Sequence, residues 1–182
     1  MAHFGAGVEQ ALHYLFRLGA DESDLRPSAR DMADFYQLPP SVAAKLFTRL
    51  EKAGIVHADE GRDGGFSLAR PLGRITVLEV ADAIEGRKAL FQCKDIRQTC
   101  AAFDGGTPDW ASSGVCAIHA AMIEAEQAMR RSLAGVTLQD IANRARKTIP
   151  ASFRDKSAEW FRARRRQRRL PRKRAAEERK QG

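Results

Sequence analysis

Residues 46–86, LFTRLEKAGIVHADEGRDGGFSLARPLGRITVLEVADAIEG, contain the patterns that decide the fold. The first of them is the end of a helical pattern, and Gly54 suits the position after the last turn of a helix. Two strand-like runs, Ile55–Asp59 and Gly65–Ala69, flank a turn of the sequence DGG, which predicts a β-hairpin. Thr76 then precedes an apolar periodic run and suits the N-cap of a short helix.

Three helical patterns precede this hairpin. The first runs from about Gly7 to Leu18, and the second begins at the N-cap Ser28 and must end before Pro39. The third covers PPSVAAKLFTRLEKAG, and its expected buried face has the spacing of an amphipathic helix. That face consists of Ala43, Leu46, Phe47 and Leu50. Three helices followed by a hairpin predict a mainly α fold with a small β-hairpin wing, the winged helix-turn-helix.

The third helix directs small, polar and basic side chains towards solvent, as a helix that reads the major groove of DNA does. The start of the second helix and the wing tip add contacts to the DNA backbone in such a fold. The candidate DNA-binding residues are Ser28, Ser41, Val42, Lys45, Thr48, Arg49 and Arg62. A winged helix that binds another protein instead of DNA is the alternative, and the wing residue Glu60 favours it, because phosphate repels a carboxylate.

The second half of the chain divides into three segments after the predicted DNA-binding domain of residues 1–86. Residues 87–116 are irregular and contain all three cysteines, and residues 117–148 contain a long helix and a short closing helix. An apolar stripe along the long helix predicts a dimer seam, with burial against its own domain as the alternative. The stripe consists of Ile118, Met122, Ala125, Met129 and Leu133.

Charge is concentrated at the C-terminal end. Residues 151–182 contain 13 Lys and Arg and 4 Asp and Glu, whereas residues 1–150 contain 18 and 19. We therefore expect residues 149–182 to form a basic, flexible tail that adds phosphate contacts without reading sequence. The basic isoelectric point is thus a property of the tail, and it says little about the folded part.

The irregular segment carries four potential metal ligands, Cys93, Cys100, Cys116 and His119, in the spacing C-x6-C-x15-C-x2-H. Thiolate and imidazole donors bind iron–sulfur clusters or zinc, and zinc would use all four in a closed tetrahedral site. Free thiols that act as a redox switch are the alternative, and an enzyme with a cysteine nucleophile and His119 as base is a remote one. The count of three cysteines is odd and too low for a disulfide scaffold.

Residues 46–86 resemble the core of the Rrf-two family of bacterial regulators, and the similarity extends over about residues 5–145. Its hallmarks are a G-x-x-G-G-[FY]-x-L wing, here Gly61 to Leu68, and an I-T-[VL]-x-[ED]-V-x-x-A-I-[ED]-G helix. The resemblance implies a dimeric transcription factor that binds a pseudo-palindromic operator in double-stranded DNA. Several members carry an arginine for the minor groove where this chain has Glu60, which leaves Arg62 as the wing's candidate.

The resemblance also implies an iron–sulfur cluster between the wing domain and the long helix. The stretches G-V-E-x-A-L-H and F-x-C-x-x-I-R are similar to those of redox-sensing members whose [2Fe–2S] cluster has two cysteine ligands, a glutamate and a histidine. Carried over, the ligands are Cys93 and Cys116 of one subunit with Glu9 and His13 of the other. Cys100 and His119 are the alternates, as in the three-cysteine sites of the IscR and NsrR type, and a [4Fe–4S] cluster or zinc is the alternative cofactor.

Other classes of protein are not favoured by the sequence. No run of 18 apolar residues is present, so no membrane span is expected, and the N-terminus lacks the pattern of a secretory signal. We therefore expect a cytoplasmic, non-enzymatic regulator that senses redox or related stress through its cluster. A regulator of the same fold that uses zinc or a thiol switch remains the alternative.

Overall fold

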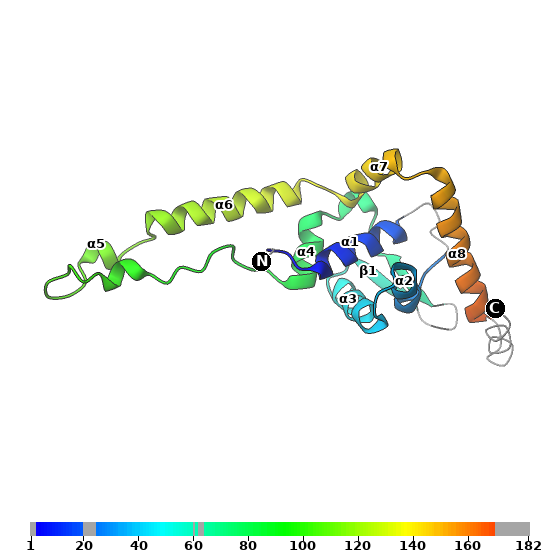
Figure 1. The fold of residues 1–182 in the computed structure, drawn as a ribbon, viewed down its shortest axis with the longest axis horizontal. Helices are drawn as coiled ribbons and strands as arrows, with labels where there is room; N and C mark the ends of the chain where they lie inside the picture. The colour runs from blue at the N-terminus through cyan, green and yellow to red at the C-terminus, as the bar shows by residue number, and fades with distance from the viewer. Residues whose placement is uncertain (1–2, 20–24, 60, 62–63, 170–182) are drawn as a thin grey trace.

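The computed structural model describes residues 3–19, 25–59, 61 and 64–169. The fold is mainly helical with one two-stranded antiparallel hairpin, which confirms the predicted class (Figure 1). The elements in chain order are α1 (Ala6–Leu18), α2 (Ala29–Tyr36), α3 (Pro40–Lys52), β1 (Val56–Asp59), β2 (Gly65–Leu68), the 3-10 turn η1 (Leu72–Arg74), α4 (Val77–Glu85), the 3-10 turn η2 (Ile96–Thr99), α5 (Asp109–Ser112), α6 (Ala117–Ala134), α7 (Leu138–Thr148) and α8 (Ala151–Arg169).

The core of the winged domain lies where α1 crosses α3 and α4. The four apolar residues expected on the inner face of α3 are all buried, as are Val8, Tyr14 and Leu15 of α1. The rings of Tyr14 and Phe47 are stacked with their centroids 5.5 Å apart. Helix α1 is therefore packed directly on the helix that is expected to read DNA, and a movement of one displaces the other.

The hairpin pairs β1 with β2 in the register Val56 to Leu68 and Asp59 to Gly65. The N–H of Phe66 also donates to the carbonyl of Pro27, 3.0 Å away, so β2 adheres to the segment before α2. A Cβ atom added to Gly65 would overlap the carbonyl oxygen of Arg26. This close backbone approach is the physical reason why the wing has glycine at that position.

The two N-caps expected from the sequence, Ser28 and Thr76, are confirmed, and Thr137 caps α7 in the same way. Ser28, Thr76 and Thr137 each accept a hydrogen bond from the backbone N–H three residues later and form complete capping boxes. The hydroxyl and backbone N–H of Thr137 hold the pKa of Asp140 below its usual value. The two threonine caps also join α4 to α7, because Thr76 and Thr137 form an isolated antiparallel bridge.

Helix α6 and the segment that leads to it form an arm. Here "arm" denotes residues 87–134, which project away from the winged domain (Figure 1). None of the 18 residues of α6 is buried. Arg130 of α6 makes a bidentate ion pair with Asp82 of α4, with N–O distances of 3.1 and 2.6 Å, and Glu126 accepts from the N–H of Leu90. The irregular segment expected over 87–116 contains only the short elements η2 and α5.

Residues 151–169 differ from the expected flexible tail, because they form α8 and pack beside α2 (Figure 1). Phe161 of α8 is 3% exposed, and its ring lies 4.8 Å from that of Phe35. Arg164 and Arg168 face the buried carboxylate of Asp31, at 3.5 and 3.2 Å. Burial of the Phe161 ring and neutralisation of the Asp31 carboxylate therefore dock α8 on α2, although the basic composition of this segment predicts that it is solvated. Residues 170–182 of the expected tail lie outside the described residues.

We expect Phe161→Ala to lower the free energy of unfolding by about 3 kcal/mol, because it removes a buried ring from the contact between α8 and α2. Urea denaturation followed by circular dichroism measures the change. Phe153→Ala on the same helix is the matched control, since Phe153 is 49% exposed and should shift the midpoint little. Equal midpoints for the two variants would contradict the docking of α8.

No helix among the described residues is both long enough and apolar enough to cross a membrane.

Candidate functional site

The outer face of α3 presents most of the residues expected to bind DNA. Ser41, Lys45, Thr48 and Arg49 are exposed, whereas Val42 is half-buried against the core. Two of these side chains already have partners within the chain. The Thr48 hydroxyl donates to the carbonyl of Ala44, 3.0 Å away, and the Arg49 guanidinium donates to the carbonyl of Ile84.

The Arg49 contact places a cation on the C-terminal end of α4, where the helix dipole is negative. This contact connects α3 to α4, so Arg49 helps to fix the orientation of α3 on the domain and also adds positive charge to the exposed face. Lys45 lies one turn before it on the same exposed face. Ser41 and Lys45 are therefore the α3 candidates whose polar groups make no contact that fixes them to the domain, within the part of the chain described.

The other two expected DNA-binding positions lie beside α3. The hydroxyl of Ser28 accepts from the N–H of Asp31 at 3.1 Å, which leaves its own proton for an outside acceptor. It stands at the N-terminus of α2, an end that favours phosphate through its free amides. Arg62 and Glu60 of the wing tip lie outside the described residues.

Helix α8 adds basic residues that sequence reasoning assigned to a solvated tail. Arg164 contacts Asp34 and Asp31 of α2, and Arg168 donates to the carbonyl oxygens of Gly64 and Arg26 at 2.8 and 3.1 Å. These contacts hold the C-terminal half of α8 against the start of α2 and the wing. The signal available in the sequence was the aromatic pair Trp160 and Phe161 within the basic run.

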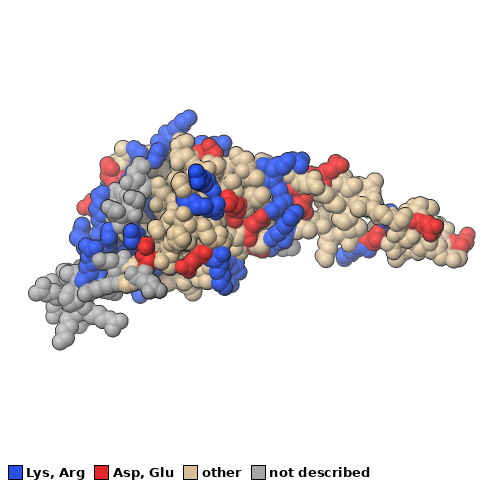
Figure 2. Space-filling model, turned by 180° about the vertical axis from the view of Figure 1, so that it is seen from behind, with Lys and Arg blue, Asp and Glu red and all other residues tan. Residues whose placement is uncertain are grey.

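The basic side chains of the molecule gather at the end that carries α8. Figure 2 shows Lys and Arg crowded there, whereas the arm at the opposite end carries fewer of them, together with acidic side chains. Phosphate contacts are electrostatic and independent of base sequence, so the α8 end of the molecule suits a nucleic-acid backbone.

Glu9 and His13 stand one turn apart on the exposed face of α1, as their spacing predicts. The backbone at His13 is held by the Tyr36 hydroxyl, which donates to its carbonyl oxygen at 3.2 Å, and the two rings lie 5.6 Å apart. Burial raises the pKa of Tyr36, while the charge and hydrogen bond of Arg17 lower it in part. The phenol therefore stays protonated and keeps α1 in place at neutral pH.

The cysteines lie on the arm and differ in their surroundings. Cys93 and Cys116 are half-buried, and each sulfur accepts a backbone N–H, from Asp95 at 3.4 Å and from His119 at 3.3 Å. Cys116 is also the N-cap of α6. Cys100 is exposed, and no hydrogen bond between described residues reaches its sulfur.

The start of α6 lies beside the segment that leads to Cys93. The ring of His119 lies 6.0 Å from that of Phe91, two residues before Cys93, so the segment of Cys93 runs beside the first turns of α6. Glu9 and His13 belong to the winged domain and are not brought to the cysteines. Among the described residues of one chain, no three His, Cys, Asp or Glu side chains are placed to hold a metal ion.

The family model Rrf2, described as an iron-dependent transcriptional regulator, matches residues 4–144. The transcriptional repressor NsrR of Streptomyces coelicolor is 30% identical over 135 residues, which cover 74% of this chain and 84% of that protein. Two solved structures share the fold at 19% identity. IscR of T. potens has a TM-score of 0.60 over 82% of this chain and 93% of its own. CymR, the global cysteine regulator of B. subtilis, has a TM-score of 0.59 over 79% and 98%.

Proposed function

Because the chain belongs to the Rrf2 family of transcriptional regulators, we propose that it works as a homodimer that controls DNA binding through a [2Fe–2S] cluster. The observation that carries the proposal is the arm. It presents a long helix with no buried residue and two half-buried thiols whose sulfurs accept backbone N–H groups. Within one subunit the helix of the arm buries none of its residues, whereas a second copy of the chain can cover its apolar side chains.

The dimer is argued from the apolar side chains of α6. Ile118 is 71% exposed, and Ala125 lies exposed on the same side of the helix. A helix is stable in water when its apolar face is buried, and the own domain buries none of these residues. The contacts of Glu126 and Arg130 flank the part of the stripe that is half-buried within the subunit, so Ile118 and Ala125 are the part left exposed for the helix of a second subunit.

The donor set fits the cluster only when two chains are combined. Cys93 and Cys116 would supply the soft thiolates that hold one iron, and backbone N–H donors such as those to their sulfurs are among the features that set a cluster's reduction potential. Glu9 and His13 of the second subunit would hold the other iron through harder oxygen and nitrogen donors. When bound, the cluster would supply a one-electron redox response, and imidazole in place of thiolate raises the potential.

Helix α1 connects this site to α3. Its outer face carries Glu9 and His13, and its inner face packs Tyr14 on Phe47 of α3. A displacement of α1 at its outer face would pass to α3 through this close packing. Small shifts suffice when the dimer has two discrete arrangements.

The proposed DNA-binding face consists of Ser41, Lys45 and the rest of the exposed side of α3, with Ser28 and α8 contributing from neighbouring elements. Two such faces related by a two-fold axis fit a pseudo-palindromic operator whose half-sites are one or more helical turns apart. The α3 side chains would read bases, while the arginines of α8 would add phosphate contacts that fix orientation.

We expect Lys45→Ala to weaken operator binding about tenfold, because it removes a cation from the centre of this face. Fluorescence anisotropy with a duplex from the region upstream of the gene measures Kd at fixed salt. Lys52→Ala is the matched control, since Lys52 is exposed at the opposite end of α3. If both variants weaken binding equally, α3 does not enter the groove with its N-terminal end.

An oxygen-free preparation tests the cluster. We expect visible absorbance together with iron and acid-labile sulfide in equal amounts. A colourless protein with bound zinc, or with no metal, would contradict the cluster and leave a zinc-stabilised or thiol-switch regulator of the same fold. A cubane signature would indicate the three-cysteine [4Fe–4S] alternative with Cys100 as a ligand.

A further inference from the structure

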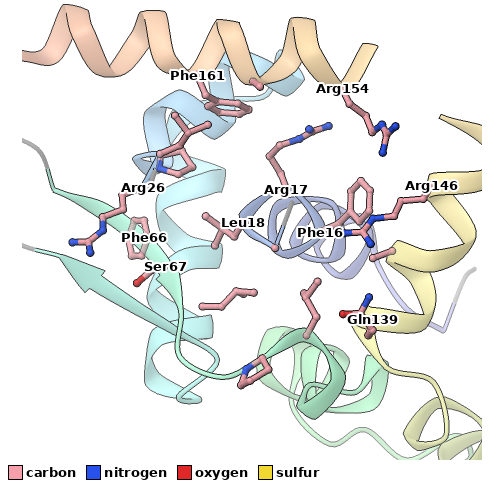
Figure 3. Close-up of a pocket in the computed structure, with 18 of the residues that line it drawn as sticks. Phe16, Arg17, Leu18, Arg26, Phe66, Ser67, Gln139, Arg146, Arg154 and Phe161 are labelled. Atoms are coloured by element: carbon pink, nitrogen blue, oxygen red, sulfur yellow. The ribbon is translucent and has the colours of Figure 1, made fainter. Parts of the chain in front are cut away.

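A cavity of about 800 Å³ lies between the winged domain and the C-terminal helices, and no residue of the arm or of α3 is among the described residues that line it. Its walls come from α1, from strand β2, from α7 and from α8 (Figure 3). This volume is in the range of small-molecule sites in proteins. Neither the DNA face nor the proposed cluster site uses it.

One part of the cavity wall is apolar. Phe66 and Leu68 of β2, Leu18 of α1 and Leu72 line it, and Phe161 of α8 contributes another ring. Water in such a space has few hydrogen-bond partners, so an apolar group that displaces it is favoured. This part fits the hydrocarbon body of a ligand.

Among the described residues that line the cavity, the charge is unbalanced, with five arginines and Asp155 as the one acidic residue. Arg26 and Arg70 are paired with Asp59 and Glu79 at 3.2 and 3.0 Å. The side chains of Arg17, Arg146 and Arg154 extend into the space between α1, α7 and α8 (Figure 3).

Arg17 contributes a cation whose hydrogen bonds are only partly satisfied, since its guanidinium is hydrogen-bonded to Tyr36. Its Nε atom is buried and has no hydrogen-bond partner among the described residues, while its guanidinium carbon lies 5.3 Å from the centre of the Phe35 ring. A buried donor without a partner is costly, and an anionic acceptor removes the cost. Arg154 approaches the same space from α8 and makes no ion pair within the described part of the chain.

We propose that this cavity is an effector site for an amphipathic organic anion, with the anionic group between Arg17 and Arg154 and the apolar body against β2. The shared chemistry is a carboxylate or phosphate head on an unbranched or aromatic hydrocarbon. The effector role follows from the walls, because β2 carries the wing and α8 contacts α2 and the wing through Arg164 and Arg168. A ligand that separates α8 from α1 displaces both elements of the DNA face.

Isothermal titration calorimetry of the full chain without DNA tests the binding step, with decanoate, decyl phosphate, decanol and acetate as probes. We expect one or both of the amphipathic anions to bind with a Kd below about 100 µM. Decanol lacks the charge and acetate lacks the apolar body, so both should bind at least tenfold more weakly. Binding of decanol as tight as that of decanoate, or no binding of either anion, would overturn the proposal.

Three variants locate the site. Arg154→Ala should weaken decanoate binding about tenfold by removing one charge-assisted hydrogen bond. Ala158→Phe should abolish binding by filling the cavity while both arginines remain. Lys156→Ala is the control with unchanged binding, since Lys156 is exposed on the same helix and does not line the cavity. Equal effects of all three would show nonspecific binding to a basic surface and would contradict the site.

The effector role rests on the proposed DNA binding, whereas the calorimetric binding step does not, so the two can fail separately. At saturating ligand we expect operator Kd to change at least fivefold in the parent chain and to stay constant in Ala158→Phe. Ligand binding without any change in operator Kd would overturn the effector role. Loss of operator binding in every sample would instead contradict the proposed function.

Discussion

Replacing Cys93 or Cys116 with alanine is expected to remove the cluster, with at least a tenfold loss of iron, sulfide and visible absorbance. A cluster iron that loses one of its two thiolate ligands would be held much less tightly. The measurement is iron and sulfide analysis with absorbance and electron paramagnetic resonance, on protein purified without oxygen. Native mass spectrometry under the same conditions measures the number of clusters bound to each dimer.

Cys100→Ala is the matched control for this prediction. Its sulfur is exposed and accepts no hydrogen bond within the described structure, so the variant should retain the parent iron content. Loss of colour in all three single variants would favour a three-cysteine cluster. Retention in Cys116→Ala would contradict the proposed ligand set.

Glu9→Ala and His13→Ala extend the test to the second subunit. Both residues are exposed on α1, so neither change removes a packing contact from the core. We expect each to reduce iron content and to alter the paramagnetic signal, since each removes a donor from the second iron. Unchanged spectra in both, with a loss in His119→Ala, would assign the histidine ligand to α6 instead.

Ile118→Glu combined with Ala125→Glu should convert the protein to a monomer and weaken operator binding by about 100-fold or more. Two carboxylates per subunit would have to enter the apolar seam, and an unpaired charge is expensive to bury. A monomer binds a single half-site and loses the increase in affinity that comes from linking two DNA-binding domains in one dimer. Sedimentation velocity measures the oligomeric state, and anisotropy measures Kd.

Gln127→Glu controls for charge on α6. Gln127 is exposed on the side of the helix opposite the stripe, so it should leave the dimer and the operator Kd unchanged. Circular dichroism should show the parent helix content in the double variant, because Ile118 and Ala125 are exposed within one subunit. A dimer that survives the double substitution would show that α6 does not form the seam.

The winged domain could be predicted from the sequence because its signals are local. The caps Ser28, Thr76 and Thr137 bond to the backbone three residues away, and the inner face of α3 repeats with the helical period. Hairpin strands that are adjacent in the chain pair without a long connection. Each of these features depends on neighbours within one turn or one strand.

The candidate DNA face was predicted less completely, for a different reason. Exposure of Lys45 follows from the helical period, but the contact of Arg49 with Ile84 depends on how α4 crosses α3. The half-burial of Val42 likewise depends on the neighbouring helices. Side chains at the edge of a helix face acquire their surroundings from tertiary packing.

The winged fold, its helix boundaries and the one-turn spacing of Glu9 and His13 follow from local sequence signals. The docking of α8 on α2 depends on tertiary contacts, because the buried carboxylate of Asp31 and the ring of Phe161 find their partners across more than a hundred residues. Composition averages over a segment, and the strongly basic average of α8 conceals its two buried residues, Ser157 and Phe161. The cavity between α1, β2, α7 and α8 has the same origin, since it exists only where four distant segments meet.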